Sequence, residues 1–204
     1  MTGPATRSTI AIAVLLSAGG CARPQAIEAG FWFEPVTFQS KVIGGAVTAE
    51  DLATIEAVAR AELTQAFDGL PIVISARKDA TFRVRVIQEV RDRRLRSNWG
   101  VAGESFSLPG LGGNSSVSFL FLASGAVAYA PAATSRRDLI DAIGRGIGRT
   151  AAHELAHLLL PQAPIHDSTD IRSYEFDSAA RREQFYGEMH WAIARPWLEE
   201  RLRR

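Results

Sequence analysis

His153-Glu154-Leu155-Ala156-His157 is the stretch that decides how this 204-residue chain is interpreted. On an α-helix, residues four apart lie one above the other on the same face, so both imidazoles can reach one metal ion. Glu154 is rotated by roughly 100° from His153 on a period of 3.6 residues, which places it beside the metal and not under it. The spacing therefore predicts two metal ligands and one general base on a single helix.

The residues around this motif favour a buried helix. Thr150-Ala151-Ala152 precede the motif and Leu158-Leu159-Leu160 follow it, and Glu154 is the only charged residue between Arg149 and Asp167. A solvated surface helix carries charges on its outer face, and this stretch carries almost none. The sequence therefore disfavours the alternative in which these histidines are exposed on a surface helix and bind no metal.

The expected helix begins near Ser135, whose spacing to Asp138 is that of a capping box, and Pro161 stops it. It contains three interior glycines: Gly144, Gly146 and Gly148. Each glycine costs about 1 kcal/mol relative to alanine in a helix interior. We therefore expect close packing against a neighbouring element. A phosphate-binding loop is excluded because no strand leads directly into the run and no Lys-Ser/Thr follows it.

A catalytic zinc ion typically has three protein ligands and an open fourth position, and the helix supplies two ligands. His166 is the favoured third ligand, because it is the nearest downstream histidine and imidazole suits zinc well. Acidic alternatives lie nearby or on the expected last helix: Asp170, Glu175, Glu183 and Glu188. The choice between His166 and Glu175 stays open at this point.

With these residues the chain resembles the zincin metallopeptidases and, within them, the metzincins. The metzincin signature continues H-E-x-x-H with x-x-G-x-x-H, often followed by Asp. Here His166-Asp167 follow after a spacer that is three residues longer, and Leu160 or Pro161 replaces the family glycine. No Ser-x-Met turn follows. A Glu175 ligand would resemble the thermolysin-like gluzincins instead, and an Asp170 ligand the aspzincins.

The resemblance implies an α+β, zincin-like fold: a mixed twisted sheet with a backing helix, an active-site helix and a C-terminal helix. It also implies a bound Zn²⁺ held by His153, His157 and His166, and hydrolysis of peptide bonds with Glu154 as general base. Tyr174 is a candidate hydrogen-bond donor to an oxyanion, although an ordinary half-buried tyrosine fits the same position.

Hydrophobic patterning predicts the elements outside the motif. The expected elements are a strand over 36–42, a helix over about 48–67, strands over 72–74 and 82–87, a long loop or hairpin over 97–116, strands over 117–122 and 127–129, and a last helix over 179–194 that Pro196 bends or ends.

The N-terminal segment predicts export. Arg7 supplies a positive charge, and the apolar stretch over 10–18 is too short to span a bilayer as a helix. Gly19-Gly20 then precede Cys21, which is the only cysteine of the chain. This arrangement resembles a bacterial lipoprotein processing site, although Ala18 stands where leucine is usual. Ordinary signal cleavage nearby is the alternative.

Three segments are therefore expected: a signal peptide over 1–21 with Cys21 as the mature N-terminus, a tether over 22–34, and a metallopeptidase domain over 35–204. The protein would be lipid-anchored in the bacterial cell envelope and face the periplasm or the exterior. The formal net charge is +1. The sequence has no basic stripe of the kind that nucleic acid requires. The expected partners are a peptide or protein substrate and, through lipid on Cys21, the membrane.

Two functions from different classes fit these features. The first is an exported zinc-dependent metallopeptidase. The second is a non-catalytic envelope lipoprotein that uses a zincin fold for binding or structure. Glu154 discriminates between them, because a closed structural zinc site usually has four protein ligands and no use for an unligated carboxylate beside the metal. The sequence indicates neither the substrate nor the oligomeric state.

We predict that Cys21 becomes the mature N-terminus and carries lipid, because an apolar segment and two glycines directly precede it. Mass spectrometry of the native protein should show acyl mass on Cys21. The variant Cys21→Ser should release the protein from membranes. A soluble periplasmic form that begins at another residue would contradict this prediction.

Overall fold

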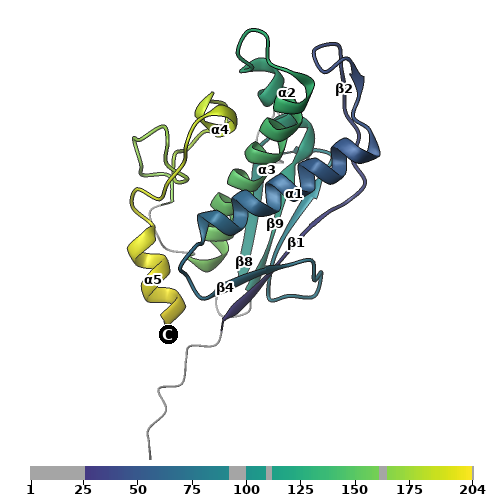
Figure 1. Ribbon diagram of the computed structural model, residues 1–204. Helices are drawn as coiled ribbons and strands as arrows, with labels where there is room; N and C mark the ends of the chain where they lie inside the picture. The colour runs from purple at the N-terminus through teal and green to yellow at the C-terminus, as the bar shows by residue number, and fades with distance from the viewer. Residues whose placement is uncertain (1–25, 92–99, 109–111, 161–164, 204) are drawn as a thin grey trace, which may run out of the picture.

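A five-stranded mixed sheet forms the frame of the fold in the computed structural model, which describes residues 26–91, 100–108, 112–160 and 165–203 (Figure 1). The strands, in spatial order, are β4 (Ile72–Ser75), β1 (Ile27–Phe33), β5 (Phe82–Ile87), β9 (Gly112–Ser118) and β8 (Gly103–Leu108). The first four are parallel, and β8 pairs antiparallel with β9 at the edge. The expected α+β class with a mixed sheet is confirmed.

Two small antiparallel ribbons accompany this sheet. One pairs β2 (Gln39–Ser40) with β3 (Gly45–Ala46), and the other pairs β6 (Val90–Arg91) with β7 (Gly100–Val101). The second ribbon leads directly into the edge strand β8.

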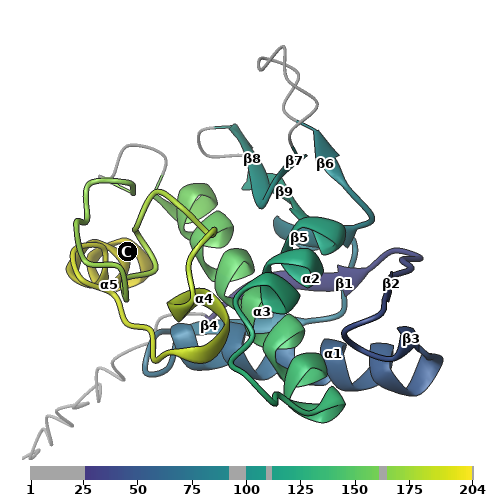
Figure 2. The same cartoon turned by 90° about the horizontal axis from the view of Figure 1, so that it is seen from above.

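Five helices complete the described part of the chain. They are α1 (Ala49–Ala66), α2 (Phe119–Ala128), α3 (Arg136–Leu159), α4 (Glu183–Tyr186) and α5 (Arg195–Arg203). The yellow C-terminal segment with α4 and α5 lies beside α3 in both views (Figures 1 and 2). Within the described residues, no helix combines the length and the apolar character that crossing a membrane requires.

The core lies between the sheet and the two long helices α1 and α3. Strand residues of one sheet face, such as Phe31 and Val84, belong to the same buried cluster as Ile55 of α1 and Ile143 and Ile147 of α3. Each of these side chains is at most 1% exposed. Their burial supplies the main stabilisation of the domain and holds α3 against the sheet.

Both long helices begin where the sequence predicts. Thr48 caps α1, and its hydroxyl and the carboxylate of Asp51 form the two reciprocal hydrogen bonds of a capping box. The hydroxyl of Ser135 caps α3 by accepting a hydrogen bond from the backbone N–H of Asp138. The predicted strands over 72–74 and 82–87 are confirmed as well.

The three glycines of α3 allow two neighbours to approach its backbone. A Cβ atom added at Gly148 would lie 2.4 Å from the carbonyl oxygen of Ala59, and one at Gly144 would lie 2.7 Å from the Cβ of Val58. Both positions face α1. A Cβ atom at Gly146 would instead lie 2.5 Å from the ring of Phe185. The predicted close packing of these glycines is confirmed.

The expected tether over 22–34 is wrong for the part that the structure describes. Residues 27–33 form β1, which lies between β4 and β5 and places Phe31 at 0% exposure. The apolar run at its end is thus a sheet strand in the core and not a linker, and the domain begins before residue 35. The signal segment over 1–21, including Cys21, lies outside the described residues.

The strands predicted over 117–122 and 127–129 are also wrong beyond Ser118. The strand β9 ends there, and the hydroxyl of Ser118 caps α2. The buried residues of α2 follow helical spacing: Phe119, Leu122, Ala123 and Ala126. A continuous apolar run fits a buried strand and a buried helix equally well, so periodicity could not separate them. The expected excursion over 97–116 is a hairpin of β8 and β9 in its described part.

The last two predicted elements differ from the structure in length. The strand expected over 36–42 is reduced to Gln39–Ser40. The helix expected over 179–194 is replaced by the single turn of α4, and α5 begins only at Arg195. Pro196 is the second residue of α5, where a missing N–H costs nothing because the first helical N–H groups have no intrahelical partner.

We predict that Gly148→Ala lowers the free energy of unfolding, because the added methyl group meets the α1 backbone and not a flexible side-chain end. Overpacking of this kind costs about 1–3 kcal/mol. The higher helix propensity of alanine offsets about 1 kcal/mol of this cost, so the net loss of stability should lie between about 0 and 2 kcal/mol. Chemical denaturation measures the change. Arg137→Ala, at an exposed position of the same helix, is the matched control and should change stability by less than about 0.5 kcal/mol. A Gly148→Ala protein that is more stable than wild type would contradict the prediction and show that α1 can move away.

Candidate metal centre

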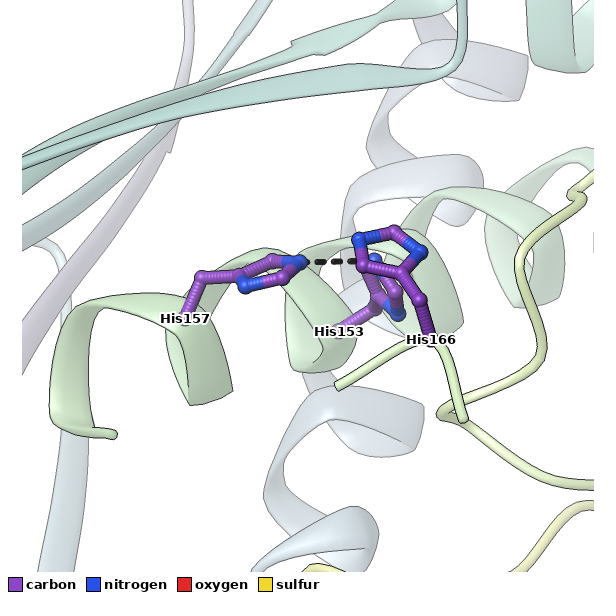
Figure 3. Close-up of side chains that lie close together, drawn as sticks. All are labelled: His153, His157 and His166. Atoms are coloured by element: carbon purple, nitrogen blue, oxygen red, sulfur yellow. Dashed lines mark hydrogen bonds between the residues drawn. The ribbon is translucent and has the colours of Figure 1, made fainter. Parts of the chain in front are cut away.

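Three imidazoles converge beside the C-terminal half of α3 (Figure 3). His153 and His157 project from the helix, and His166 comes from the segment that follows it. One ligand nitrogen of each ring lies within 4.8 Å of the others, and the Nε2 atoms of His153 and His157 are 3.1 Å apart. Tetrahedral zinc with bonds of ~2.0–2.1 Å separates its ligand nitrogens by ~3.3 Å. The three histidines that the sequence singled out therefore form a cluster that can hold a metal ion.

His153 is oriented by the main chain of the C-terminal segment. Its Nδ1 lies 2.6 Å from the carbonyl oxygen of Tyr174. A carbonyl can only accept, so Nδ1 carries the proton and Nε2 offers its lone pair to the cluster. Burial lowers the pKa of His153 to about 4. Burial, followed by the neighbouring imidazoles, lowers the pKa of His157 to about 3. Both rings are thus neutral at pH 7, as metal binding requires.

His166 is oriented by a carboxylate. Its Nδ1 donates to Oδ1 of Asp177 at 2.6 Å, which leaves Nε2 free for a metal. Its backbone has a φ of 143°, a value that L-residues rarely adopt. Such a conformation costs about 1–3 kcal/mol and persists only where the surrounding structure enforces it. The segment after α3 therefore bears strain at the residue that joins the two helical histidines.

Glu154 lies between α3 and the edge strand β8. It is 6% exposed and accepts a hydrogen bond at Oε2 from the hydroxyl of Ser105. A Cβ atom added at Gly103 would lie only 2.3 Å from Oε1 of Glu154. Burial raises the pKa of Glu154 to about 7, although the hydrogen bond from Ser105 opposes this shift. The carboxyl group is therefore held in place beside the triad by residues of β8.

Sequence reasoning missed Gly103 and Ser105. Both lie in the Gly- and Ser-rich stretch that was interpreted as a loop or hairpin. The available signal was the small size of these residues, because a strand that passes close to a helix side chain has little room for its own side chains. Ser115 of the neighbouring strand extends the network, since its Oγ lies 2.7 Å from Oγ of Ser105.

Tyr174 contributes to the site through its main chain. Its ring packs against Trp191 with centroids 4.7 Å apart. Burial and, after it, the charge of Glu62 raise the pKa of the hydroxyl to about 12, so the hydroxyl keeps its proton. The main-chain carbonyl oxygen of Tyr174 accepts the hydrogen bond from Nδ1–H of His153. Its role as an oxyanion donor stays a prediction.

The acidic alternatives for the third ligand have other partners. The carboxylate of Glu175 accepts hydrogen bonds from the backbone N–H groups of residues 192–194 and from the hydroxyl of Ser173. Asp170 lies 3.0 Å from His190. Within the described part of the chain, the metal-compatible cluster contains the three histidines and no carboxylate. Glu175 thus holds the C-terminal segment together, and Glu183 and Glu188 lie outside the cluster.

A cavity of about 450 Å³ opens beside His153, Glu154 and His166. Residues 101–103, around the start of β8, form one side, and residues 176–179 of the C-terminal segment form another. Cavities that bind small molecules or side chains typically measure roughly 300–1,000 Å³. The cavity is therefore large enough for a small molecule or part of a larger ligand to lie against the histidine cluster and the Glu154 carboxyl group.

Neither the protein-family models nor the curated proteins that were compared with this chain give a match. The function of the chain is therefore inferred from the geometry and chemistry of the site itself.

We predict that the mature domain binds one Zn²⁺ per chain and that His166→Ala lowers the affinity by at least about 100-fold, since loss of an outer-shell partner alone costs 10–100-fold. Competition titration with a chromophoric chelator measures both quantities. Asp170→Asn is the control and should bind zinc like wild type, because Asp170 contacts His190 and not the cluster. Unchanged affinity in His166→Ala would remove this residue from the ligand set.

Proposed function

We propose that this protein is an exported zinc-dependent metallopeptidase. The observation that carries the proposal is the combination of three convergent imidazoles with one buried carboxyl group that is adjacent to them but outside the ligand set. Neutral imidazoles suit zinc, as they also suit copper, iron and nickel, and three protein ligands would leave a fourth position open for catalysis if zinc is bound. Zinc, when bound, supplies a Lewis acid that polarises a carbonyl and lowers the pKa of water.

In this proposal Glu154 moves the proton. Its carboxyl group takes a proton from the attacking water and later gives it to the leaving amine. Ser105 orients the carboxyl group through its hydrogen bond to Oε2, and Gly103 leaves the space that the group occupies. His153 and His157 would hold the metal through their Nε2 atoms, which lie 3.1 Å apart, and the carbonyl of Tyr174 fixes the His153 ring.

The fold supports a zincin-like interpretation. The helix α1 packs against α3, which carries the motif. The helix α5 follows near the C-terminus. The edge strand β8 runs beside Glu154. An extended peptide can pair with such an edge through main-chain hydrogen bonds and place a peptide carbonyl near the cluster. A peptide or protein is therefore the proposed substrate, and the lipid on Cys21 remains part of the proposal for its location in the cell envelope.

The alternative, a non-catalytic lipoprotein with a structural metal, explains less of the site. A closed structural zinc site normally has four protein ligands. The metal-compatible cluster of the described residues has three, and Glu154 is held beside it by a dedicated hydrogen bond. A buried carboxyl group without an ion-pair partner is costly to maintain, even with one hydrogen bond. Its presence favours a role in proton transfer.

We predict that Glu154→Gln keeps the fold and the zinc but loses hydrolysis by a factor of about 100 or more, the order expected for removal of a general acid–base. Cleavage of a degenerate peptide mixture, followed by mass spectrometry, measures the rate, and elemental analysis measures the zinc. Glu188→Gln, an exposed acidic residue of the C-terminal segment, is the matched control and should retain both. A Glu154→Gln variant as fast as wild type would exclude Glu154 as the base.

A further inference from the structure

Arg181 is a buried cation in the wall of the cavity beside the histidine cluster. It is 9% exposed and lines the same cavity as His153 and Glu154. Two of its nitrogens donate to the main-chain carbonyls of Ser173 and Ser178. Its Nε is buried and has no hydrogen-bond partner among the described residues. The guanidinium carbon also lies 4.9 Å from the centroid of the Phe176 ring. The guanidinium group is therefore held in a fixed place, and each of the two nitrogens that bind a carbonyl keeps a second N–H for another acceptor.

No carboxylate of the described residues forms an ion pair with this guanidinium group. Arg149 lines the same cavity, but the carboxylate of Glu62 neutralises it at 2.9 Å. Of the acidic residues in the cavity wall, Asp177 is bound to His166 and Glu154 to Ser105. Burial lowers the pKa of Arg181 to about 10, which still leaves it protonated at pH 7. Burial of an unpaired charge is costly, so an anionic partner from outside the chain would be stabilised here.

The position of Arg181 relative to the metal cluster is set by two consecutive carbonyl groups. Arg181 binds the carbonyl of Ser173, and the His153 ring binds the next carbonyl, that of Tyr174. The cation and the His153 ring thus bind neighbouring carbonyl groups of one segment, and both line the same cavity. A ligand whose carbonyl reaches the cluster can therefore place a neighbouring group against Arg181 within the same cavity.

We propose that Arg181 makes this cavity a carboxylate-binding subsite, so that the substrate carries a carboxylate next to the bond that is cleaved. The proposal rests on the proposed peptidase function and names its substrate class. The carboxylate belongs either to an aspartate or glutamate side chain or to the free C-terminus of the peptide. Guanidinium binds both through charge-assisted hydrogen bonds, and an isosteric amide lacks the charge.

The test compares matched peptides with the zinc-loaded protein. Sequencing the products of a degenerate peptide mixture first locates the preferred cut. Peptides with both ends blocked, which differ only by Glu or Gln beside that cut, then test whether a side-chain carboxylate is preferred over its amide. Peptides that differ only by a free or amidated C-terminus measure the terminal source. We expect kcat/KM to favour the carboxylate by about 10-fold or more in one of the two pairs.

Variants then assign the preference to Arg181. Arg181→Gln should bring the carboxylate-to-amide ratio of kcat/KM close to one, and Arg181→Lys should keep most of it because the charge remains. Arg182→Gln removes an exposed neighbouring charge and should leave the ratio unchanged. If the carboxylate-to-amide ratio of kcat/KM is near one for both peptide pairs in the wild type, the proposal is wrong. This outcome needs no variant, so it can be reached even if Arg181→Gln does not fold.

A binding measurement separates this proposal from the proposed function. Calorimetry with the Glu154→Gln protein compares the affinities of the same peptide pairs without any cleavage. If no cut is found, degenerate peptide mixtures that differ only by Glu or Gln, or only by a free or amidated C-terminus, take the place of these pairs. Tighter binding of the carboxylate peptide, lost in the double variant with Arg181→Gln, supports the subsite even if the wild type hydrolyses nothing. Hydrolysis with no preference for the carboxylate, by contrast, supports the peptidase and overturns the subsite.

Discussion

The burial of α3 on nearly all sides is the constraint on which the rest of this protein depends. The sheet covers one side, α1 approaches the backbone at Gly144 and Gly148, and Phe185 of the C-terminal segment approaches it at Gly146. A helix enclosed in this way cannot shift without breaking close-packed contacts. Its two histidines are consequently held at fixed positions, which would lower the conformational cost of binding a metal ion there.

The polar groups around α3 form a second layer that depends on this packing. Glu175 binds three consecutive backbone N–H groups of residues 192–194 and thereby folds the C-terminal segment back on itself. That fold presents the carbonyl of Tyr174 to His153 and the carbonyl of Ser173 to Arg181. The carboxylate of Glu175 thus has a structural role: it positions His153 of the histidine cluster and Arg181 of the cavity wall.

Much of the fold follows from local patterns, and the errors have physical causes. The capping box of Ser135 and Asp138 identified the start of α3, because a capping hydrogen bond involves neighbours in sequence. The run after Ser118 was assigned to strands because a fully buried helix lacks polar positions that would reveal its period. The strand β1 was interpreted as a tether because its pairing partners, β4 and β5, lie about 40–60 residues further along the chain.

The sequence by itself determined that His153 and His157 share a helix face with Glu154 beside them, because helical period is a property of adjacent residues. Only the tertiary structure decided what completes the site. It brings His166 to the cluster, turns Glu175 toward backbone N–H groups, and places Ser105 and Gly103 of the edge strand against Glu154. These outcomes depend on which distant segments pack together and on where each buried polar group finds a partner, and spacing along the chain encodes neither.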